Sequence, residues 1–274
     1  MNSAVPYRLR DLHKEVPSFT VQTLHAKRSS SCVIIPVLNE NGRIKNQLTR
    51  MKGLAKTIDI LIADGGSTDG ALEPALLKKC GVRSLLVKTG PGRLSAQMRM
   101  GLAYALQEGY TGFIFIDGND KDDPSAIPRF VQELNRGYDH VQGSRFVPGG
   151  RSIRTPMMRY WPLRLIHAPL ISLSAGFWYT DTTNGFRAYS RRFIQDPRVN
   201  PFRNVFSQYE LHYYLAIRAP QLGYRTKEIP VTREYPAGKV PTKISFFKGN
   251  YKILKTLLAA CLHLYDPPAS RNTL

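Results

Sequence analysis

The chain has 274 residues, of which 39 are Lys or Arg and 20 are Asp or Glu, giving a formal net charge of +19. A hydrophobic content of 42% is enough for a substantial core and excludes a wholly disordered chain. Three widely spaced cysteines argue against a disulfide framework or a thiolate zinc site and favour a reducing compartment.

Strands and helices are predicted to alternate from residue 32 onward. The apolar, strand-like runs cover 32–37, 58–63, 82–88 and 113–117, and the helical stretches lie near 40–55, 70–80, 94–108 and 124–134. Continuous apolar strands separated by helices are typical of a mostly parallel sheet covered on both faces. We therefore expect an α/β fold.

The pattern changes after Gly150. Residues 156–180 are apolar, aromatic and basic; strands are predicted at 185–190 and 227–231, and helices at 209–222 and 244–264. The predicted organisation is an N-terminal extension (1–31), one mixed α/β domain (32–240) and a basic C-terminal amphipathic helix with a tail (241–274).

The positive charge is concentrated in the second half of the chain. Residues 1–150 carry a net charge of +6 and residues 151–274 a net charge of +13. Such a basic half favours phosphate-bearing partners, which include nucleic acid, anionic lipid and a phosphorylated substrate.

No secretory signal or membrane-spanning segment is predicted. Residues 1–31 lack the apolar stretch of a signal peptide, and the uncharged apolar run at 165–180 has 16 residues, whereas a spanning helix needs about 20. We expect a cytoplasmic protein, peripheral on the cytoplasmic face of a membrane.

Acidic side chains stand at the predicted ends of two strands, where parallel sheets bind ligands. Asp117 begins the cluster DGNDKDD, whose oxygens could hold Mg²⁺ or form a turn that caps the next helix at Pro124. Asp64 is followed by two glycines that allow close backbone approach, and its carboxylate can accept a bond from a base or ribose. Arg93 is either a solvated helix-start residue or a diphosphate clamp.

Seven segments in register resemble the inverting glycosyltransferases of family 2, which have the GT-A (Rossmann-like) nucleotide-sugar fold. The segments are VIIPVLNE (33–40), IADGGSTDG (62–70), GRLSAQ (92–97), IDGNDKDDP (116–124), GSRF (143–146), TDTTNGFRAYS (180–190) and SQYELH (207–212). Within that family the chain is similar to dolichyl- and polyprenyl-phosphate mannosyl- and glucosyltransferases. The resemblance covers roughly residues 32–245.

The resemblance implies a nucleotide side and a metal site. The nucleotide would be held by Pro36, Asn39, Glu40, Asp64, Arg93 and Asp117. Asp117 and Asn119 occupy the first and third places of the family's DxD metal motif.

The resemblance also implies a sugar and acceptor side. Arg145 and Arg187 would face the phosphate and sugar, Asp181 the sugar or acceptor, and Gln208 and Glu210 the sugar hydroxyls. Arg233 and Lys239, in REYPAGK, would close a mobile loop over the site.

The metal motif departs from the family pattern. Asn119 is a weaker oxygen donor than the usual carboxylate, and Lys121 stands where some polyprenyl-phosphate enzymes have Gln. We expect Mg²⁺ or Mn²⁺ at Asp117, with Asn119 or Asp120 assisting. Undiminished activity in excess EDTA would instead indicate Lys121 as the neutralising charge.

The expected activity is transfer of a hexose from a nucleoside-diphosphate sugar to a polyprenyl phosphate at an anionic membrane surface. The alternative acceptor is a saccharide hydroxyl in cell-surface polysaccharide or lipopolysaccharide synthesis, which would require Asp181 or Glu210 as a general base. Residues 151–179 and the C-terminal helix are interpreted either as packed helices or as amphipathic elements on the membrane.

Two other classes fit less well. A nucleic-acid-binding protein is disfavoured because acidic strand ends would repel a phosphate backbone and no recognisable motif is present. A nucleotidyltransferase usually needs a glycine-rich loop with a basic residue near its first helix, and PVLNENGRI is a poor match.

Overall fold

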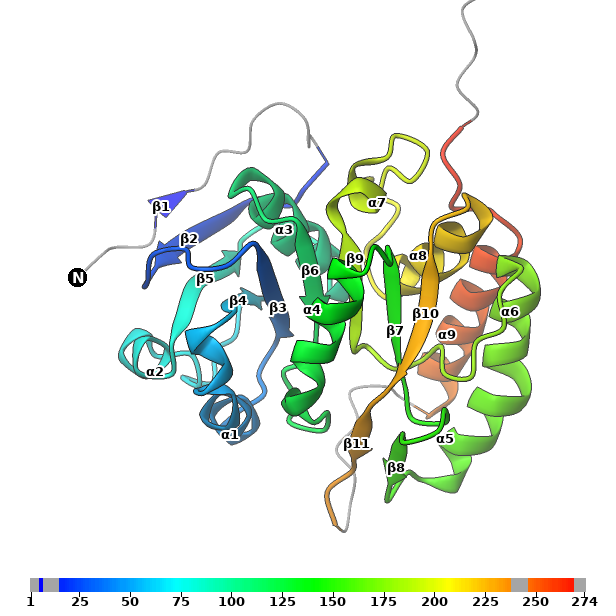
Figure 1. Ribbon diagram of the computed structural model, residues 1–274, viewed down its shortest axis with the longest axis horizontal. Coiled ribbons are helices and arrows are strands. Elements are labelled where there is room, and N and C mark those ends of the chain that lie inside the picture. The colour runs from blue at the N-terminus through cyan, green and yellow to red at the C-terminus, as the bar shows by residue number, and fades with distance from the viewer. Residues whose placement is uncertain (1–4, 7–14, 238–245, 269–274) are drawn as a thin grey trace, which may run out of the picture.

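The structure is a computed structural model that describes residues 5–6, 15–237 and 246–268 (Figure 1). Its centre is a nine-stranded sheet. The strand order is β1 (Val5–Pro6), β2 (Phe19–Thr23), β5 (Val82–Lys88), β4 (Asp59–Asp64), β3 (Ser31–Val37), β6 (Gly112–Phe115), β9 (Arg187–Ser190), β7 (His140–Ser144) and β10 (Thr226–Pro230).

The sheet is mostly parallel, as predicted. β5, β4, β3 and β6 pair in parallel, as do β7 and β10. β9 runs antiparallel between β6 and β7, and β2 runs antiparallel to β5. The carboxyl ends of β3, β4 and β6 therefore meet at one edge of the sheet.

Helices cover both faces because the central strands are apolar on both sides. On one face α1 (Gly42–Met51), α2 (Pro74–Lys79) and α4 (Ile127–Asn135) pack on side chains such as Val33 and Ile35. On the other, α3 (Leu94–Gln107), α7 (Arg191–Gln195) and α8 (Glu210–Gln221) pack on Cys32 and Ile34. Short 3₁₀ turns, Leu54–Lys56 and Pro124–Ala126, complete the loops.

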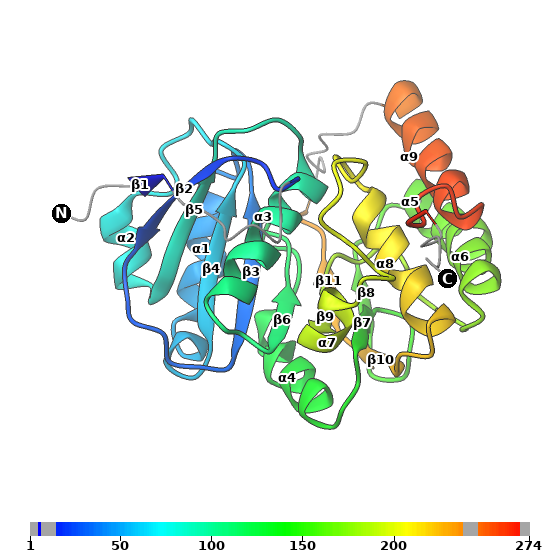
Figure 2. The same ribbon diagram turned by 90° about the horizontal axis from the view of Figure 1, so that it is seen from above.

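A helical layer lies beyond β10 (Figure 2). It comprises α5 (Met157–Pro162), the π-helical turn η4 (Leu163–His167), α6 (Ala168–Ala175) and α9 (Phe246–Cys261). Ile171 of α6 and Leu257 and Ala260 of α9 share a core cluster with Tyr213 and Ile217 of α8. The C-terminal helix thus packs on the domain through one face.

Three features of the strands differ from the prediction. Residues 19–23 of the N-terminal extension belong to the sheet, since β2 pairs with β5 along its whole length. β7 was not predicted as a strand, because its sequence HVQGS is polar and only its tertiary contacts bury it. A small parallel sheet of β8 (Arg151–Ile153) and β11 (Thr232–Glu234) was also missed.

The segment 151–179 packs on the domain through one face, where Ile171, Ala175 and Tyr179 are buried, and it is not buried on its other face. Large apolar side chains of α5, η4, α6 and the following turn are exposed, among them Met158 at 70%, Leu173 at 77% and Trp178 at 68%. None of the helices in the described ranges has the length and hydropathy needed to span a membrane.

Candidate active site

The loops that follow β3 and β4 are joined at the predicted nucleotide edge. The Asp64 carboxylate accepts hydrogen bonds from the Ser67 backbone N–H (3.0 Å) and hydroxyl (2.6 Å). Asn39 donates its backbone N–H to the Ser67 hydroxyl, and its amide oxygen accepts the backbone N–H of Thr68. Pro36 and Glu40, which pairs with Arg43 at 2.7 Å, complete this edge. The structure therefore brings four predicted nucleotide residues together.

Gln97 fixes the spacing of these two strands. Its buried amide donates to the backbone carbonyls of Val37 (2.7 Å) and Ala63 (2.8 Å), at the ends of β3 and β4. A Cβ on Gly65 would lie 3.1 Å from the Gln97 amide nitrogen, so glycine suits this position. Gln97 lay inside a predicted motif segment, but nothing in the sequence pattern indicated this role.

The start of α3 is held against the segment that precedes α8. The backbone N–H of Arg93 donates to the Ser207 carbonyl, and that of Ser95 to the Gln208 carbonyl, both at 2.8 Å. These bonds bring the backbone at Arg93, a predicted nucleotide residue, close to that at Gln208, a predicted sugar residue. The Glu210 carboxylate accepts hydrogen bonds from the backbone N–H groups of Ser207 and Gln208, and it thereby satisfies two backbone donors just before the start of α8.

A buried cation lies against the predicted metal motif. The Arg233 guanidinium contacts Asp117 at 3.1 Å and also pairs with Asp122. Burial raises the pKa of Asp122 to about 6, although the neighbouring Arg233 guanidinium opposes the shift. In the sequence Asp122 was part of the acidic cluster at 117–123, which could hold a cation or cap the next helix. Arg233 itself lies in β11, not in a mobile loop, which corrects that prediction.

The donor set at Asp117 does not fit a divalent ion. The Asn119 amide nitrogen, not its oxygen, faces Asp117 at 3.3 Å, and Asp120 pairs with Arg50 at 2.7 Å. Within the described residues, no group of three His, Cys, Asp or Glu side chains is placed to hold a metal. Mg²⁺ requires oxygen ligands around it, whereas Asp117 here faces a guanidinium.

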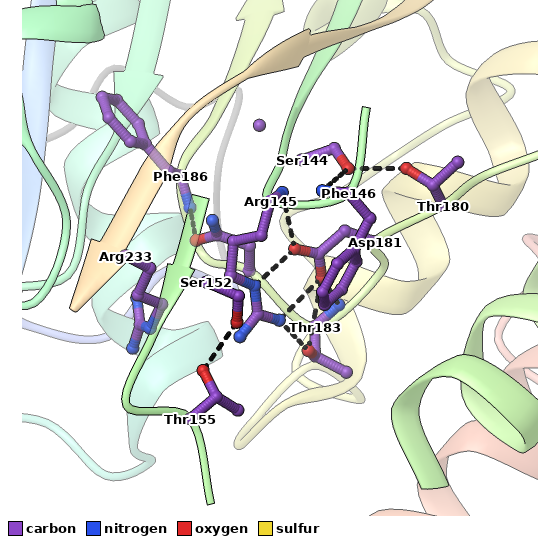
Figure 3. Close-up of polar contacts among 12 residues, drawn as sticks. Ser144, Arg145, Phe146, Ser152, Thr155, Thr180, Asp181, Thr183, Phe186 and Arg233 are labelled. Carbon is purple, nitrogen blue, oxygen red and sulfur yellow. Dashed lines mark hydrogen bonds and ion pairs between the residues drawn. The ribbon is translucent and has the colours of Figure 1, made fainter. Parts of the chain in front are cut away.

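Arg145 and Asp181 form a two-point ion pair between β7 and the segment before β9 (Figure 3). The Arg145 Nε and Nη2 atoms donate to the two Asp181 oxygens at 2.7 and 2.9 Å, and both side chains are buried. Burial alone would raise the pKa of Asp181, but Arg145 and backbone N–H groups hold that pKa below its ordinary value.

Glu228 supports this pair and was not predicted. Its carboxylate in β10 accepts the Thr180 N–H (2.9 Å), the Thr180 hydroxyl (2.8 Å) and the Asp181 N–H (3.1 Å). The Thr183 hydroxyl also accepts from Arg145 at 3.0 Å. These bonds fix the Asp181 backbone, so the pair is rigidly placed.

Arg187 does not face the site. Its guanidinium is buried and donates to three backbone carbonyls, those of Thr182, Asn184 and His212, at 2.6–2.8 Å. The prediction that Arg187 contacts phosphate and sugar is therefore wrong, because all of these contacts are internal. Lys239 lies outside the described residues.

The comparisons with known proteins agree with this architecture. The family model described as glycosyl transferase family 2 matches residues 32–196. The chain belongs to glycosyl transferase family 2. It is therefore a glycosyltransferase, and the matched range contains most of the predicted site.

Two curated relatives are named for transfer to polyprenyl carriers. Polyprenol monophosphomannose synthase of Mycolicibacterium smegmatis is 28% identical over 212 residues, covering 73% of this chain and 76% of the relative. Undecaprenyl-phosphate mannosyltransferase of Micrococcus luteus is 28% identical over 204 residues, covering 73% and 81%.

Solved structures share the fold. Glucosyl-3-phosphoglycerate synthase of Mycobacterium tuberculosis, in complex with Mn²⁺, UDP and glucosyl-3-phosphoglycerate, gives a TM-score of 0.60 at 18% identity over 87% of this chain and 81% of that one. The same enzyme with Mg²⁺ and UDP gives 0.58 at 18% identity, over 87% and 80%. Those enzymes hold divalent ions and UDP in a GT-A fold, and the sheet of this chain is of that class.

Proposed function

We propose that this glycosyltransferase moves a hexose from a nucleoside-diphosphate sugar to a polyprenyl phosphate, with inversion at the anomeric carbon. The names of the curated relatives support a polyprenyl-phosphate acceptor. The joined loops around Asp64 and Asn39 support a nucleotide at the edge formed by β3 and β4.

The hydrogen bonds of the two predicted general bases, Asp181 and Glu210, are the observation on which we base the choice of acceptor. Asp181 is tied to Arg145 through both oxygens, and Glu210 accepts two backbone N–H groups. A saccharide hydroxyl needs a base to take its proton, whereas a phosphate oxygen is already anionic at neutral pH. The geometry therefore favours a phosphate acceptor.

The transfer then needs no proton. A lone pair of the acceptor phosphate oxygen attacks the anomeric carbon from the side opposite the leaving group. The bond between that carbon and the diphosphate oxygen breaks, and its electron pair leaves with the nucleoside diphosphate. Arg93, exposed at the start of α3, is placed to stabilise the charge that develops there.

Arg164 is the described arginine best placed for the acceptor phosphate. It is exposed on η4, and its guanidinium lies 5.0 Å from the Phe146 ring centroid. The Arg145 guanidinium lies 5.1 Å from the same ring. Because Arg145 is committed to Asp181, we assign the phosphate contact to Arg164.

An apolar face next to Arg164 fits a membrane that carries such an acceptor. The elements α5, α6 and α9 lie together at the right of Figure 1. We define the apolar face as the exposed large apolar side chains of these elements and of the turns beside them: Met157, Met158, Trp161, Leu165, Ile166, Leu173, Trp178, Tyr251, Leu254, Leu258, Leu262 and Leu264. The exposed cations Arg164, Lys252 and Lys255 on the same helices would meet anionic headgroups. We propose peripheral binding to the cytoplasmic leaflet.

The function is tested with the purified full chain. GDP- and UDP-hexoses are screened for thermal stabilisation, and the sugar that stabilises is then offered with undecaprenyl phosphate or undecaprenol. We expect product only on the phosphate. Transfer to a saccharide hydroxyl, with none to the lipid phosphate, would contradict the proposal.

The acceptor contact is tested by Arg164→Gln. Losing a charge-assisted phosphate contact should raise the KM for undecaprenyl phosphate about tenfold while the nucleotide-sugar KM stays unchanged. The matched control is Arg129→Gln, which removes an equal charge at an exposed position of α4.

Membrane binding is tested by flotation with anionic liposomes. Leu173→Asp should reduce the floated fraction without lowering the melting temperature, because Leu173 is exposed on α6. Val205→Asp alters an exposed apolar residue outside these helices and should float like the wild type. If the wild type did not float with anionic liposomes at low salt, membrane binding through this apolar face would be excluded.

A further inference from the structure

The Arg233 guanidinium contacts Asp117, the first residue of the segment that resembles the family's DxD metal motif. We propose that Arg233 takes the place of a divalent ion there, so that this transferase binds its donor and transfers the sugar without a metal. The proposal rests on the proposed function for the identity of the donor. Its physical basis is the contact of one guanidinium with two carboxylates, Asp117 and Asp122.

The backbone fixes Arg233 at this position. The Glu234 N–H donates to the Lys121 carbonyl at 2.8 Å, and the Asp123 N–H donates to the Thr232 carbonyl at 3.0 Å. These two bonds join β11 to the motif on either side of Arg233, and β11 also pairs with β8. These backbone bonds fix β11 next to the motif, and the Arg233 guanidinium is therefore held at the motif by the strand that carries it.

The second carboxylate ties the guanidinium down further. The Asp122 side chain is fully buried, and the Arg233 side chain is 10% exposed. A divalent ion that bound Asp117 would have to separate Arg233 from it or lie beside a buried positive charge. Either change is unfavourable, because an unpaired charge in a buried site is strongly destabilising.

The side chains of Asn119 and Lys121, which follow Asp117 in the motif, are also arranged in a way that suits a protein cation and not a metal ion. The Asn119 amide oxygen accepts the Lys121 backbone N–H at 3.3 Å and is turned away from Asp117. The Lys121 ammonium lies 4.9 Å from the centroid of the Tyr235 ring, and Tyr235 is two residues after Arg233 in the chain. Two carboxylates and two side-chain cations thus form a charge-balanced group.

The leaving diphosphate would then be stabilised by protein cations. We assign this task to the side-chain cations Arg93 and Lys121, while Arg233 keeps Asp117 from repelling the phosphates. Positioned cations in a site that excludes water can replace a metal in this task.

The proposal is tested first by metal binding, independently of activity. MnCl₂ is titrated into metal-free full-length protein, and the free Mn²⁺ signal is followed by electron paramagnetic resonance, with and without GDP or UDP. Because a nucleoside diphosphate itself binds Mn²⁺, each titration with nucleotide is compared with the same titration of the nucleotide without protein. The wild type should show no saturable binding. Arg233→Met should gain it, because two carboxylates are then released as oxygen ligands. Arg50→Met, which breaks the neighbouring pair with Asp120, should gain none.

The second readout is transfer in excess EDTA. Wild-type activity should be unchanged, and Arg233→Met should lose about 100-fold in EDTA, with partial recovery in Mn²⁺. Saturable Mn²⁺ binding by the wild type, or loss of its activity in EDTA, would overturn the proposal whether or not the variant folds. Failure of every nucleotide sugar to react with or without Mn²⁺ would contradict the proposed function, while the Mn²⁺ titration would still decide this inference.

Discussion

Four aspartates near the strand ends are each held by a specific partner. Asp64 is held by Ser67, Asp117 and Asp122 by Arg233, and Asp181 by Arg145. An ionised carboxylate is costly to bury unless it is paired and hydrogen-bonded. These pairings engage all four acidic groups, and we propose that Asp181 is a positioning residue for Arg145 and not a general base.

Asp181→Asn should lower the free energy of unfolding by about 3–5 kcal/mol, because it leaves the buried Arg145 guanidinium without a counter-charge. Urea unfolding at neutral pH measures the change. The control is Glu234→Gln, whose partner Arg154 is half-exposed, and whose loss should cost less than about 1 kcal/mol. Equal effects of the two substitutions would show that the Arg145 pair does not stabilise the fold.

At the scale of elements, α9 has two apolar sides with different surroundings. Leu257 and Ala260 are buried against α6 and α8, while Leu254 and Leu258 are exposed. The sequence left core packing and membrane contact as alternatives for this helix. The structure uses one side for packing and leaves the other available to lipid.

Leu257→Ala should therefore destabilise the protein by about 2–5 kcal/mol, since it opens a cavity in a packed cluster. The neighbouring substitution Leu258→Ala should change stability by no more than about 0.5 kcal/mol, because that side chain is already 42% exposed. Both are measured by urea unfolding. If Leu257→Ala had no larger effect than Leu258→Ala, α9 would not fold with the domain.

At the scale of the whole molecule, strands β7 and β9, helix α8 and the turn η4 together bury a cluster of positive and neutral groups. Arg187 is buried without an acidic partner among its hydrogen bonds, and His140, His167 and His212 are buried near it. Burial, assisted by Arg187, lowers the pKa of all three histidines, and that of His167 to about 4. The folded state therefore requires neutral imidazoles.

Stability should fall as the pH drops from about 6.5 toward 4, because the unfolded chain then binds protons that folded His167 does not. A pKa lowered from 6.5 to about 4 corresponds to roughly 3 kcal/mol once the pH is below both values. Melting temperatures at pH 7 and pH 5 check this.

The matched variants are His167→Gln and His25→Gln. His167→Gln should reduce the difference in melting temperature between pH 7 and pH 5, whereas His25→Gln, on the N-terminal segment, should leave that difference unchanged. The same pH dependence in the wild type and in His167→Gln would contradict the assignment to His167.

Much of the sheet was predictable because its central strands are buried on both faces. Runs such as CVIIPV and FIFID are continuously apolar, and this local signal is independent of distant contacts. β7 lacks that signal, since His140 and Gln142 are buried by neighbours far along the chain. The placement of Asn39, Asp64 and Asp117 at strand ends was predictable for the same local reason, because each follows a recognisable strand, whereas their proposed nucleotide role came from the family resemblance.

The charge of +19 and its concentration after residue 150 are properties of the sequence by itself, as are the strand pattern and the motifs that indicate family 2. Only the tertiary structure decided which of those charges meet. Arg145 finds Asp181 36 residues away, and Arg233 finds Asp122 111 residues away. Short-range patterns report local backbone and burial, whereas an ion pair depends on which strands become neighbours. The metal motif therefore reads as a cation site in sequence, and the fold supplies the cation from β11.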